Sequence, residues 1–149
     1  MSQETYLHTA QNIARKAHRG QTDKAGADYI LHPQRVAGHV RTLGGDDCAV
    51  AAAWLHDVLE DCDVTAEDLA AAGIPEQVII AVQAVTKRSH EPLVDYCARV
   101  RANPTALLVK RCDLADNTDP ARTALLPQDV QERLARKYAR VRELLGLNA

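Results

Sequence analysis

Apolar residues recur every three to four positions along most of this chain. In the first segment they are Tyr6, Leu7, Ala10, Ile13, Ala14 and Ala17. That spacing places them on one face of an α-helix, which we predict over about residues 3–19. The same periodicity predicts further helices over about residues 33–43, 46–61, 65–73, 75–85, 92–102, 105–117 and 127–145. The pattern therefore predicts roughly seven or eight helices.

Local signals define the starts of several of these helices. Pro33 suits the first position of a helix, because its fixed φ angle is helical and no N–H donor is needed there. Asp46 or Asp47 can cap the next helix by accepting a hydrogen bond from a free backbone N–H. Thr65 followed by Asp68 resembles a capping box at the start of another helix. These signals support the helix assignment independently of the periodicity.

The composition favours an all-α fold. The chain has no Phe and one Trp, whereas Ala and Leu are abundant. Ala and Leu are strong helix formers, and a shortage of aromatic residues disfavours a β-sandwich. At 149 residues the chain has the usual length of one domain and can bury a hydrophobic core. No internal repeat or linker divides it, so we predict a single domain over residues 1–149 with an all-α fold that is not a simple bundle.

Charge and cysteine spacing argue against several classes of protein. A formal net charge of −2 is unlike that of a general nucleic-acid binder, and the basic residues 133–142 are interpreted as a solvated helix face or a subunit contact. No stretch of about 18 apolar residues can span a membrane, and the N-terminus lacks a secretion signal, so we expect a cytoplasmic protein. The four cysteines are scattered, which argues for reduced thiols and against a cysteine zinc site. The oligomeric state stays open between a monomer and a homo-oligomer.

The segment AAAWLHDVLED, residues 51–61, combines a core-forming helix with four ionisable side chains. His56 and Asp57 are adjacent, and Glu60 and Asp61 follow one turn later. Such groups in an apolar setting need a partner, because an uncompensated buried charge is costly. A metal ion held by the first pair, with the second pair handling a water molecule, would provide that partner. The alternative is a surface hydrogen bond between His56 and Asp57 on a solvated acidic helix end.

Two further segments favour the metal interpretation. His32 stands at the end of a polar loop just before Pro33, and Asp113 lies where the apolar segment LLVKRCDLADN becomes acidic. With His56 and Asp57 they offer two imidazoles and two carboxylates. A mixed set of nitrogen and oxygen ligands suits Mn²⁺, Fe²⁺, Co²⁺ or Zn²⁺ better than an all-oxygen ion such as Ca²⁺. The sequence therefore predicts a site for one divalent metal ion.

Four motifs, in order along the chain, resemble the HD-domain phosphohydrolases. They read AHRGQTDKAGADYILHPQRVA, LHDVLEDCDVT, AVTK and VKRCDLADN. The likeness is greatest to the hydrolase domain of the (p)ppGpp synthetase/hydrolase family and to its small stand-alone relatives, and it runs from about residue 14 to residue 117. The resemblance implies an HD-domain helical fold and metal-dependent hydrolysis of a phosphoester in a small nucleotide.

The resemblance also implies roles for individual residues. The metal ligands would be His32, His56, Asp57 and Asp113, and the ion is usually Mn²⁺ in that family. Asp116 aligns with a position that does not bind the metal. Glu60 and Asp61 match a pair that positions and activates the attacking water, and either can be the main base. Substrate contacts are implied for Lys24, Tyr29, Lys87 and Asn117. The cations of Lys24, Lys87 and Arg88 would offset charge on the diphosphate.

The chain departs from the family pattern around the expected base-binding residues. The family commonly reads RKSGEPYIVHP where this chain reads TDKAGADYILHP. Asp23 therefore stands where an arginine that stacks on guanine is expected, and an acid there removes a cation–π partner. The arginine that follows the asparagine in the family's ADRLHNMR is displaced, with Arg122 as the near candidate. Because the chain ends soon after Asn117, we expect no alarmone synthetase half.

Three functional hypotheses follow from these motifs. The primary hypothesis is a small alarmone hydrolase that removes the 3′-pyrophosphate of ppGpp with a metal-activated water molecule. The first alternative is an HD phosphohydrolase that acts on another nucleotide or a phosphorylated metabolite, which the acid at position 23 keeps open. The second is a non-catalytic, metal-containing nucleotide sensor.

Overall fold

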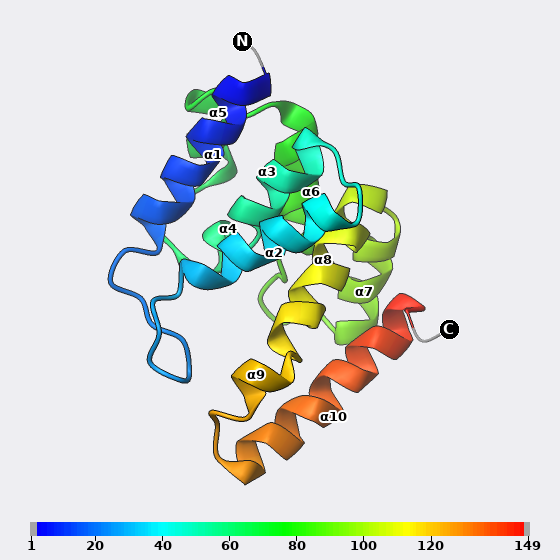
Figure 1. Ribbon diagram of the computed structural model, residues 1–149. Coiled ribbons are helices and arrows are strands. Elements are labelled where there is room, and N and C mark those ends of the chain that lie inside the picture. Colours follow the sequence, from blue (N-terminus) through cyan, green and yellow to red (C-terminus); the bar gives the residue numbers. More distant parts are fainter. Residues whose placement is uncertain (1–2, 148–149) are drawn as a thin grey trace.

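The computed structural model describes residues 3–147 (Figure 1). Within that range the chain forms ten helices, with an isolated β-bridge between Thr22 and Asp28 in the loop before the second. The helices are α1 (Gln3–Ala17), α2 (Leu31–Thr42), α3 (Asp47–Leu55), α4 (Val58–Asp61), α5 (Ala66–Ala71), α6 (Glu76–Val85), α7 (Leu93–Arg101), α8 (Pro104–Asn117), α9 (Pro120–Thr123) and α10 (Gln128–Leu145). The prediction of an all-α fold is confirmed.

Helix α3 forms the centre of the fold. Residues 49–55 are all buried. Because these side chains are apolar on every face of the helix, and several are alanines, neighbouring helices can pack closely all around it. Helices α1, α2, α6 and α8 contact it. His56, which directly follows α3, is therefore buried in the interior.

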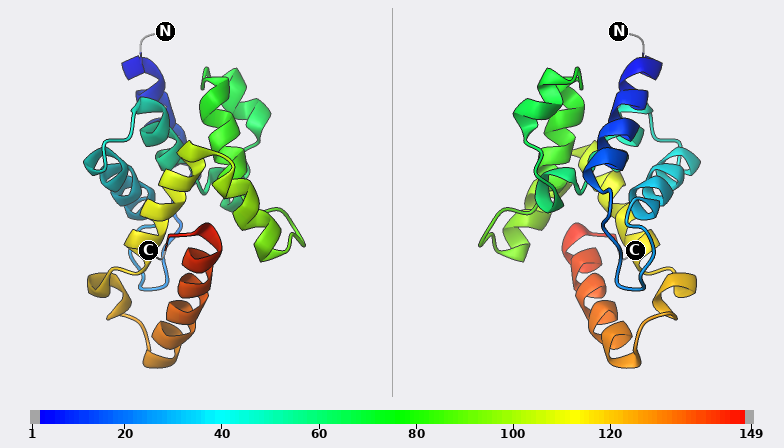
Figure 2. Two further views of the ribbon diagram at one scale, coloured as in Figure 1. Left: turned by 90° about the vertical axis from the view of Figure 1, so that its right-hand side faces the viewer. Right: turned by 90° about the vertical axis from the view of Figure 1, so that its left-hand side faces the viewer.

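Helix α8 packs beside α3 and contacts most of the other helices. It contacts α2 on one side and α6 and α7 on the other, and Figure 2 shows it between these groups. Helix α10 packs on α7 and α8. The loop between α1 and α2 lies at the same end of the molecule as α9, away from the N-terminal end of α1 (Figure 1). This arrangement brings segments distant in sequence to one side of α8.

The predicted helix starts are largely confirmed. The carboxylate of Asp46 accepts a hydrogen bond from the N–H of Ala49 at 2.9 Å and caps α3. Thr65 and Asp68 form the reciprocal bonds of a capping box at the start of α5. Helix α2 begins at Leu31, earlier than the start predicted at Pro33. Pro33 still lies in the first turn, where backbone N–H groups have no partner within the helix.

The eight predicted helix positions are all occupied, and two short helices are additional. The helix predicted over residues 46–61 is divided at His56 and Asp57, so that α3 ends and α4 begins. Asp57 has φ −102° and ψ −2°, outside the regular helical range. Helix α9 forms between the helices predicted over residues 105–117 and 127–145, where the carboxylate of Asp119 accepts the N–H of Ala121 at 3.0 Å and Pro120 takes the first position.

None of the helices between residues 3 and 147 combines the length and the apolar character that crossing a membrane requires. The four cysteines are free thiols, and Cys97 and Cys112 are buried among apolar neighbours. Buried thiols pack as small apolar groups, in agreement with the prediction from their spacing.

Candidate functional site

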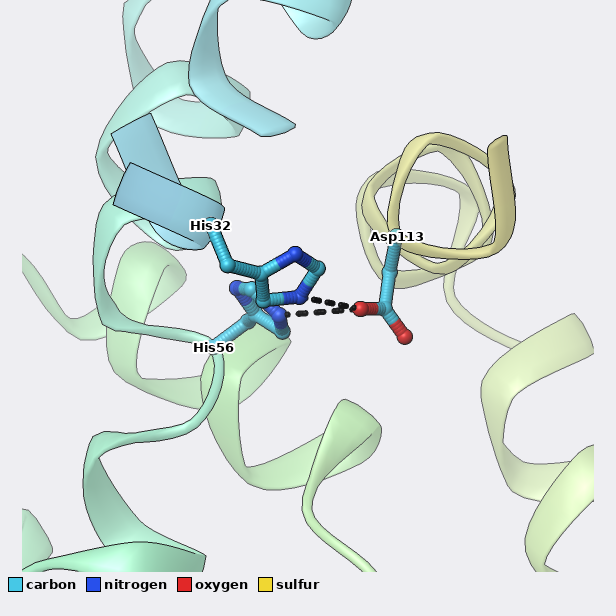
Figure 3. Close-up of side chains that lie close together, drawn as sticks. All are labelled: His32, His56 and Asp113. Atoms are coloured by element: carbon cyan, nitrogen blue, oxygen red, sulfur yellow. Dashed lines mark hydrogen bonds and ion pairs between the residues drawn. The ribbon is translucent and has the colours of Figure 1, made fainter. Parts of the chain in front are cut away.

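Three of the predicted metal ligands meet beside the end of α3 (Figure 3). His32 lies in the first turn of α2, His56 directly follows α3, and Asp113 lies on α8. Oδ1 of Asp113 is 2.8 Å from Nε2 of His32 and 3.2 Å from Nε2 of His56. One possible ligand atom from each residue lies within 4.8 Å of the other two. All three side chains are buried, so they form a compact donor set.

Asp57, the fourth predicted ligand, borders the same space. Its Oδ2 is 3.1 Å from Nε2 of His56 and 3.8 Å from Nε2 of His32. The hydroxyl of Tyr29 donates a hydrogen bond to this oxygen at 2.5 Å. The helix breaks at this residue, and the Asp57 carboxylate points toward the two imidazoles.

Hydrogen bonds behind each imidazole determine which nitrogen faces the cluster. Nδ1 of His56 lies 2.6 Å from the carbonyl oxygen of Ala53, which can only accept, so Nδ1 donates, and in the neutral ring the lone pair is on Nε2. Nδ1 of His32 donates in the same way to Oδ2 of Asp116 at 2.6 Å. Asp116 therefore lies behind His32, on the side away from Asp113. Such partners fix the orientation of an imidazole that binds a metal.

This donor set fits a divalent cation. When both imidazoles are neutral, their Nε2 lone pairs and the carboxylate oxygens of Asp57 and Asp113 face one space, and these electron-rich groups require positive charge between them. Burial acts to lower the pKa of His56, but the charges and hydrogen bonds of Asp57 and Asp113 raise it well above its usual value. Burial acts to raise the pKa of Asp113, but Lys110 and the two histidines lower it well below its usual value. A bound divalent ion would supply the positive charge that protonated imidazoles otherwise provide, and both imidazoles would then be neutral ligands.

Glu60 and Asp61 lie on α4, immediately after the helix break, and their side chains are exposed. Partial desolvation raises the pKa of the Glu60 carboxyl, and the charges of Asp61 and Asp57 raise it further. Partial desolvation and the charge of Asp57 likewise raise the pKa of Asp61. Two acids with raised pKa values thus stand next to the donor set. A carboxylate of this kind is better suited to accept a proton than an ordinary surface acid.

A cavity of about 480 Å³ opens beside the donor set and is lined by three of the four predicted substrate residues, Lys24, Tyr29 and Asn117. Tyr29 and Asn117 connect it to the cluster, because the side-chain amide of Asn117 donates to Oδ1 of Asp113 at 3.2 Å and Tyr29 binds Asp57. Lys87 lies outside the lining, exposed after α6, and its charge lowers the pKa of Glu60. The cavity volume is typical of small-molecule sites.

Asp23 and Arg122 also line this cavity and contact each other. Nη2 of Arg122 is 3.5 Å from Oδ2 of Asp23, and Nη1 is 2.8 Å from Oδ2 of Asp116. Burial acts to raise the pKa of Asp23, but backbone N–H groups of Ala27 and Ala25 and the charge of Arg122 lower it. The acid at position 23 is therefore ionised and paired with the arginine that the sequence offered as the displaced candidate.

The sequence of the chain matches the HD domain family over residues 10–145. The chain belongs to the HD domain family. The match covers the donor set, α4 and the cavity, so the resemblance inferred from the four motifs is confirmed.

Curated relatives of this HD domain carry alarmone names. A guanosine-3′,5′-bis(diphosphate) 3′-pyrophosphohydrolase of Vibrio cholerae is 37% identical, and the match covers 95% of this chain and 22% of the relative. A probable enzyme of the same name from Synechocystis is 46% identical over 48% of this chain and 9% of the relative. The chain thus spans less than a quarter of the length of either relative.

A solved structure described as a metazoan ortholog of SpoT that hydrolyses ppGpp has the same fold. Its TM-score is 0.78 at 23% sequence identity, over 94% of this chain and 85% of that chain. The predicted HD-domain helical fold is therefore confirmed.

Two residues that support the donor set of this HD domain were missed in the sequence. Nζ of Lys110 lies 3.0 Å from Oδ2 of Asp113, and Nε of Arg35 donates to Oδ1 of Asp116 at 2.8 Å. Each is three residues from a predicted ligand along a helix, Lys110 before Asp113 and Arg35 after His32, and residues at that spacing share a helix face. The spacing marks both as candidates, but the packing of each helix decides which of its charged residues reach the donor set.

Proposed function

We propose that this chain is a metal-dependent phosphohydrolase that removes the 3′-pyrophosphate of ppGpp. The observation that carries the proposal is the convergence of His32, His56 and Asp113, whose donor atoms lie within 4.8 Å of one another beside a cavity of about 480 Å³. The names of the curated relatives support ppGpp as the nucleotide.

One divalent ion would be held by His32, His56, Asp57 and Asp113, and Mn²⁺ is our first choice, with Fe²⁺, Co²⁺ or Zn²⁺ as alternatives. When bound, such an ion polarises a phosphoryl oxygen and makes water more acidic. The chain contributes the orientation of the ligands. The Ala53 carbonyl and the Asp116 carboxylate hold the two imidazole rings with Nε2 toward the cluster.

Glu60 and Asp61 would orient the attacking water molecule and accept a proton from it. Their raised pKa values support this assignment, because a proton acceptor works best when its pKa lies closer to the working pH. Glu60 and Asp61 follow the helix break at His56 and Asp57 by about one turn, which keeps both groups at the edge of the same site.

In the proposed reaction, the water oxygen forms a bond to the phosphorus that is attached to the ribose 3′ oxygen. The bond between that phosphorus and the 3′ oxygen breaks. One water proton passes to Glu60 or Asp61, and the 3′ oxygen leaves as a hydroxyl after taking up a proton. The products are GDP and pyrophosphate, with no change in oxidation state.

Residues of the cavity would hold the nucleotide during this step. Lys24 supplies a cation at the cavity wall, and Lys87 supplies a second positive charge near Glu60. Asn117 and Tyr29 lie between the cavity and the donor set and would orient the ribose and the 3′ substituent. Oriented cations and dipoles around a phosphoryl group stabilise the charge that develops in its transfer.

Asp23 supports a second candidate function. The acid replaces the base-stacking arginine implied by the family resemblance, so another nucleotide or phosphorylated metabolite is the alternative substrate. A nucleotide sensor without turnover is the alternative outside enzymes.

Pyrophosphate release from ppGpp by the purified full chain with Mn²⁺ tests the proposal. The wild type should form GDP and pyrophosphate, His56→Ala should be inactive, and Glu60→Gln should lose about 10²- to 10⁴-fold in rate. Glu67→Gln, which changes an exposed acid on α5, is the matched control and should retain full activity. Turnover of other nucleotides alone would favour the alternative substrate. Nucleotide binding without turnover with any of the four metals would favour the sensor.

A further inference from the structure

Arg122 is held by its edge at the wall of the cavity. Nη1 donates to the carboxylate of Asp116 at 2.8 Å, to the backbone carbonyl of Asp116 at 3.1 Å and to the side-chain oxygen of Asn117 at 3.4 Å. Nη2 donates to the carboxylate of Asp23 at 3.5 Å. Because the N–H groups of a guanidinium lie in its plane, these bonds use its edge and leave its flat faces uninvolved.

Both sides of this contact are anchored by local structure. Asp119 caps α9 through the N–H of Ala121, which fixes the one-turn helix that carries Arg122. On the opposite side, Oδ1 of Asp23 accepts the N–H groups of Ala25 and Ala27 at 2.9 and 3.0 Å. The second oxygen of Asp23 is thereby aimed across the cavity wall at Arg122. The guanidinium is thus oriented before any ligand binds.

The electrostatic setting of Arg122 favours a flat ligand group over an anion. Its charge is offset by two carboxylates, Asp116 and Asp23, which lowers its attraction for a phosphate. The same stretch of wall includes the apolar side chains of Leu125, Leu126 and Leu134 together with Tyr138. A paired guanidinium that lines the cavity next to apolar and aromatic side chains suits a heteroaromatic ring, since such rings stack on guanidinium planes.

We propose that Arg122 is a specificity-determining residue of the cavity, with one face of its guanidinium stacked on the purine base of the nucleotide. Asp23 is a positioning residue that holds the edge of this guanidinium and does not contact the base. The inference rests on the proposed function, and it moves the base contact from position 23 in the loop to α9. Asp23 then contributes to purine binding indirectly, because it orients the guanidinium of Arg122.

Calorimetric titration of the full chain with GDP and, separately, with inorganic pyrophosphate tests this assignment. Arg122→Lys keeps the charge next to Asp116 but removes the plane, so it should weaken GDP binding by about tenfold and leave pyrophosphate binding unchanged. Arg136→Lys, on the exposed face of α10, is the matched control and should bind both ligands like the wild type. In ppGpp hydrolysis, Arg122→Lys should raise KM by a similar factor with kcat nearly unchanged.

The positioning role of Asp23 has its own variant. Asp23→Asn keeps a carbonyl oxygen for Ala25 and Ala27 but loses the charge that faces Arg122. It should weaken GDP binding in the wild-type background and have no further effect when combined with Arg122→Lys. Because the single variant gives a result of its own, the test stands even if Arg122→Lys fails to fold.

Three results would overturn the inference. GDP binding unchanged in Arg122→Lys and in Asp23→Asn would show that the base lies elsewhere. Equal weakening for GDP and for pyrophosphate would make Arg122 a phosphate contact. A wild type that binds no GDP would remove the site. Failure of the proposed function is distinguishable from these, because the wild type would then bind GDP in an Arg122-dependent way without releasing pyrophosphate from ppGpp.

Discussion

Asp116 allows the metal site to be perturbed without changing a ligand. Its side chain is 0% exposed and accepts three hydrogen bonds, from Nδ1 of His32 at 2.6 Å, Nε of Arg35 at 2.8 Å and Nη1 of Arg122 at 2.8 Å. Asparagine has the same shape but only one acceptor oxygen. In Asp116→Asn, the new NH₂ group must face at least one of the three donors, and the ionic part of both arginine contacts is lost.

The size of the effect follows from these contacts. Loss of a partner that orients a metal-binding imidazole typically costs about 10- to 100-fold in metal affinity, or about 1.4–2.7 kcal/mol. A hydrogen bond to a charged group contributes about 1.5–3 kcal/mol to folding, but Arg35 and Arg122 are 36% and 25% exposed, so solvent screens both. We therefore expect Asp116→Asn to lower the free energy of unfolding by about 1–3 kcal/mol. We also expect it to bind Mn²⁺ about 100-fold more weakly than the wild type.

Free Mn²⁺, counted by its electron paramagnetic resonance signal during titration of metal-free protein, measures the affinity directly. Asp95→Asn, which neutralises an exposed acid on α7, is the control for the change in net charge. If Asp116→Asn is folded and binds Mn²⁺ as tightly as Asp95→Asn, the orientation of His32 by Asp116 is not part of the metal site, and the reasoning from the donor set is wrong.

Three further predictions concern stability. Leu55→Ala at the end of α3 should cost about 2–5 kcal/mol in urea unfolding, because Leu55 is fully buried, and a cost near zero would contradict the central position of α3. Asp46→Ala should cost about 1 kcal/mol through loss of the α3 cap, whereas Asp47→Ala should cost less, and equal costs would contradict the capping assignment. Hydrogen bonds from Arg99 lower the pKa of Glu91 to about 2, below its value of about 4.3 in an unfolded chain. The stability that ionised Glu91 adds is therefore complete above about pH 4.3 and is lost as the pH falls toward about 2. The difference in urea midpoint between the wild type and Glu91→Gln should therefore shrink below about pH 4.3, and a constant difference would refute this.

The helices could be predicted from the sequence because their signals are local. Periodic apolar residues and the caps at Asp46 and Thr65 act within a few residues of one another, and both caps are present in the structure. The break at His56 and Asp57 could not be predicted in this way, because neither residue disrupts a helix by itself. It accompanies contacts with Asp113, which is 57 residues from His56 in sequence.

The ligand candidates could also be found from the sequence, whereas the residues that orient them could not. His32, His56 and Asp113 are chemically distinctive in apolar segments, and their motifs occur in a diagnostic order. Asp116 and Lys110 have ordinary charged side chains whose importance depends on which face of α8 is turned inward. That orientation is set by the packing of α8 between α2 and α6, which involves contacts between distant segments.

The pairing of Asp23 with Arg122 shows the same limit for substrate binding. The sequence identified the acid as a departure and Arg122 as a displaced arginine, but these residues are 99 positions apart. Their contact required the fold of α9 against the loop before α2. A substitution that looks unfavourable in one motif can therefore be matched by a residue from another.

Pyrophosphate release from ppGpp, followed as Mn²⁺ is added stepwise to the metal-free full chain, tests the central claim most directly. If His32, His56, Asp57 and Asp113 hold a catalytic ion, the rate should rise in proportion to bound Mn²⁺, reach its maximum at one ion per chain and fall to zero with a chelator. Release that continues in the metal-free protein, or its absence when one Mn²⁺ is bound, would contradict the account.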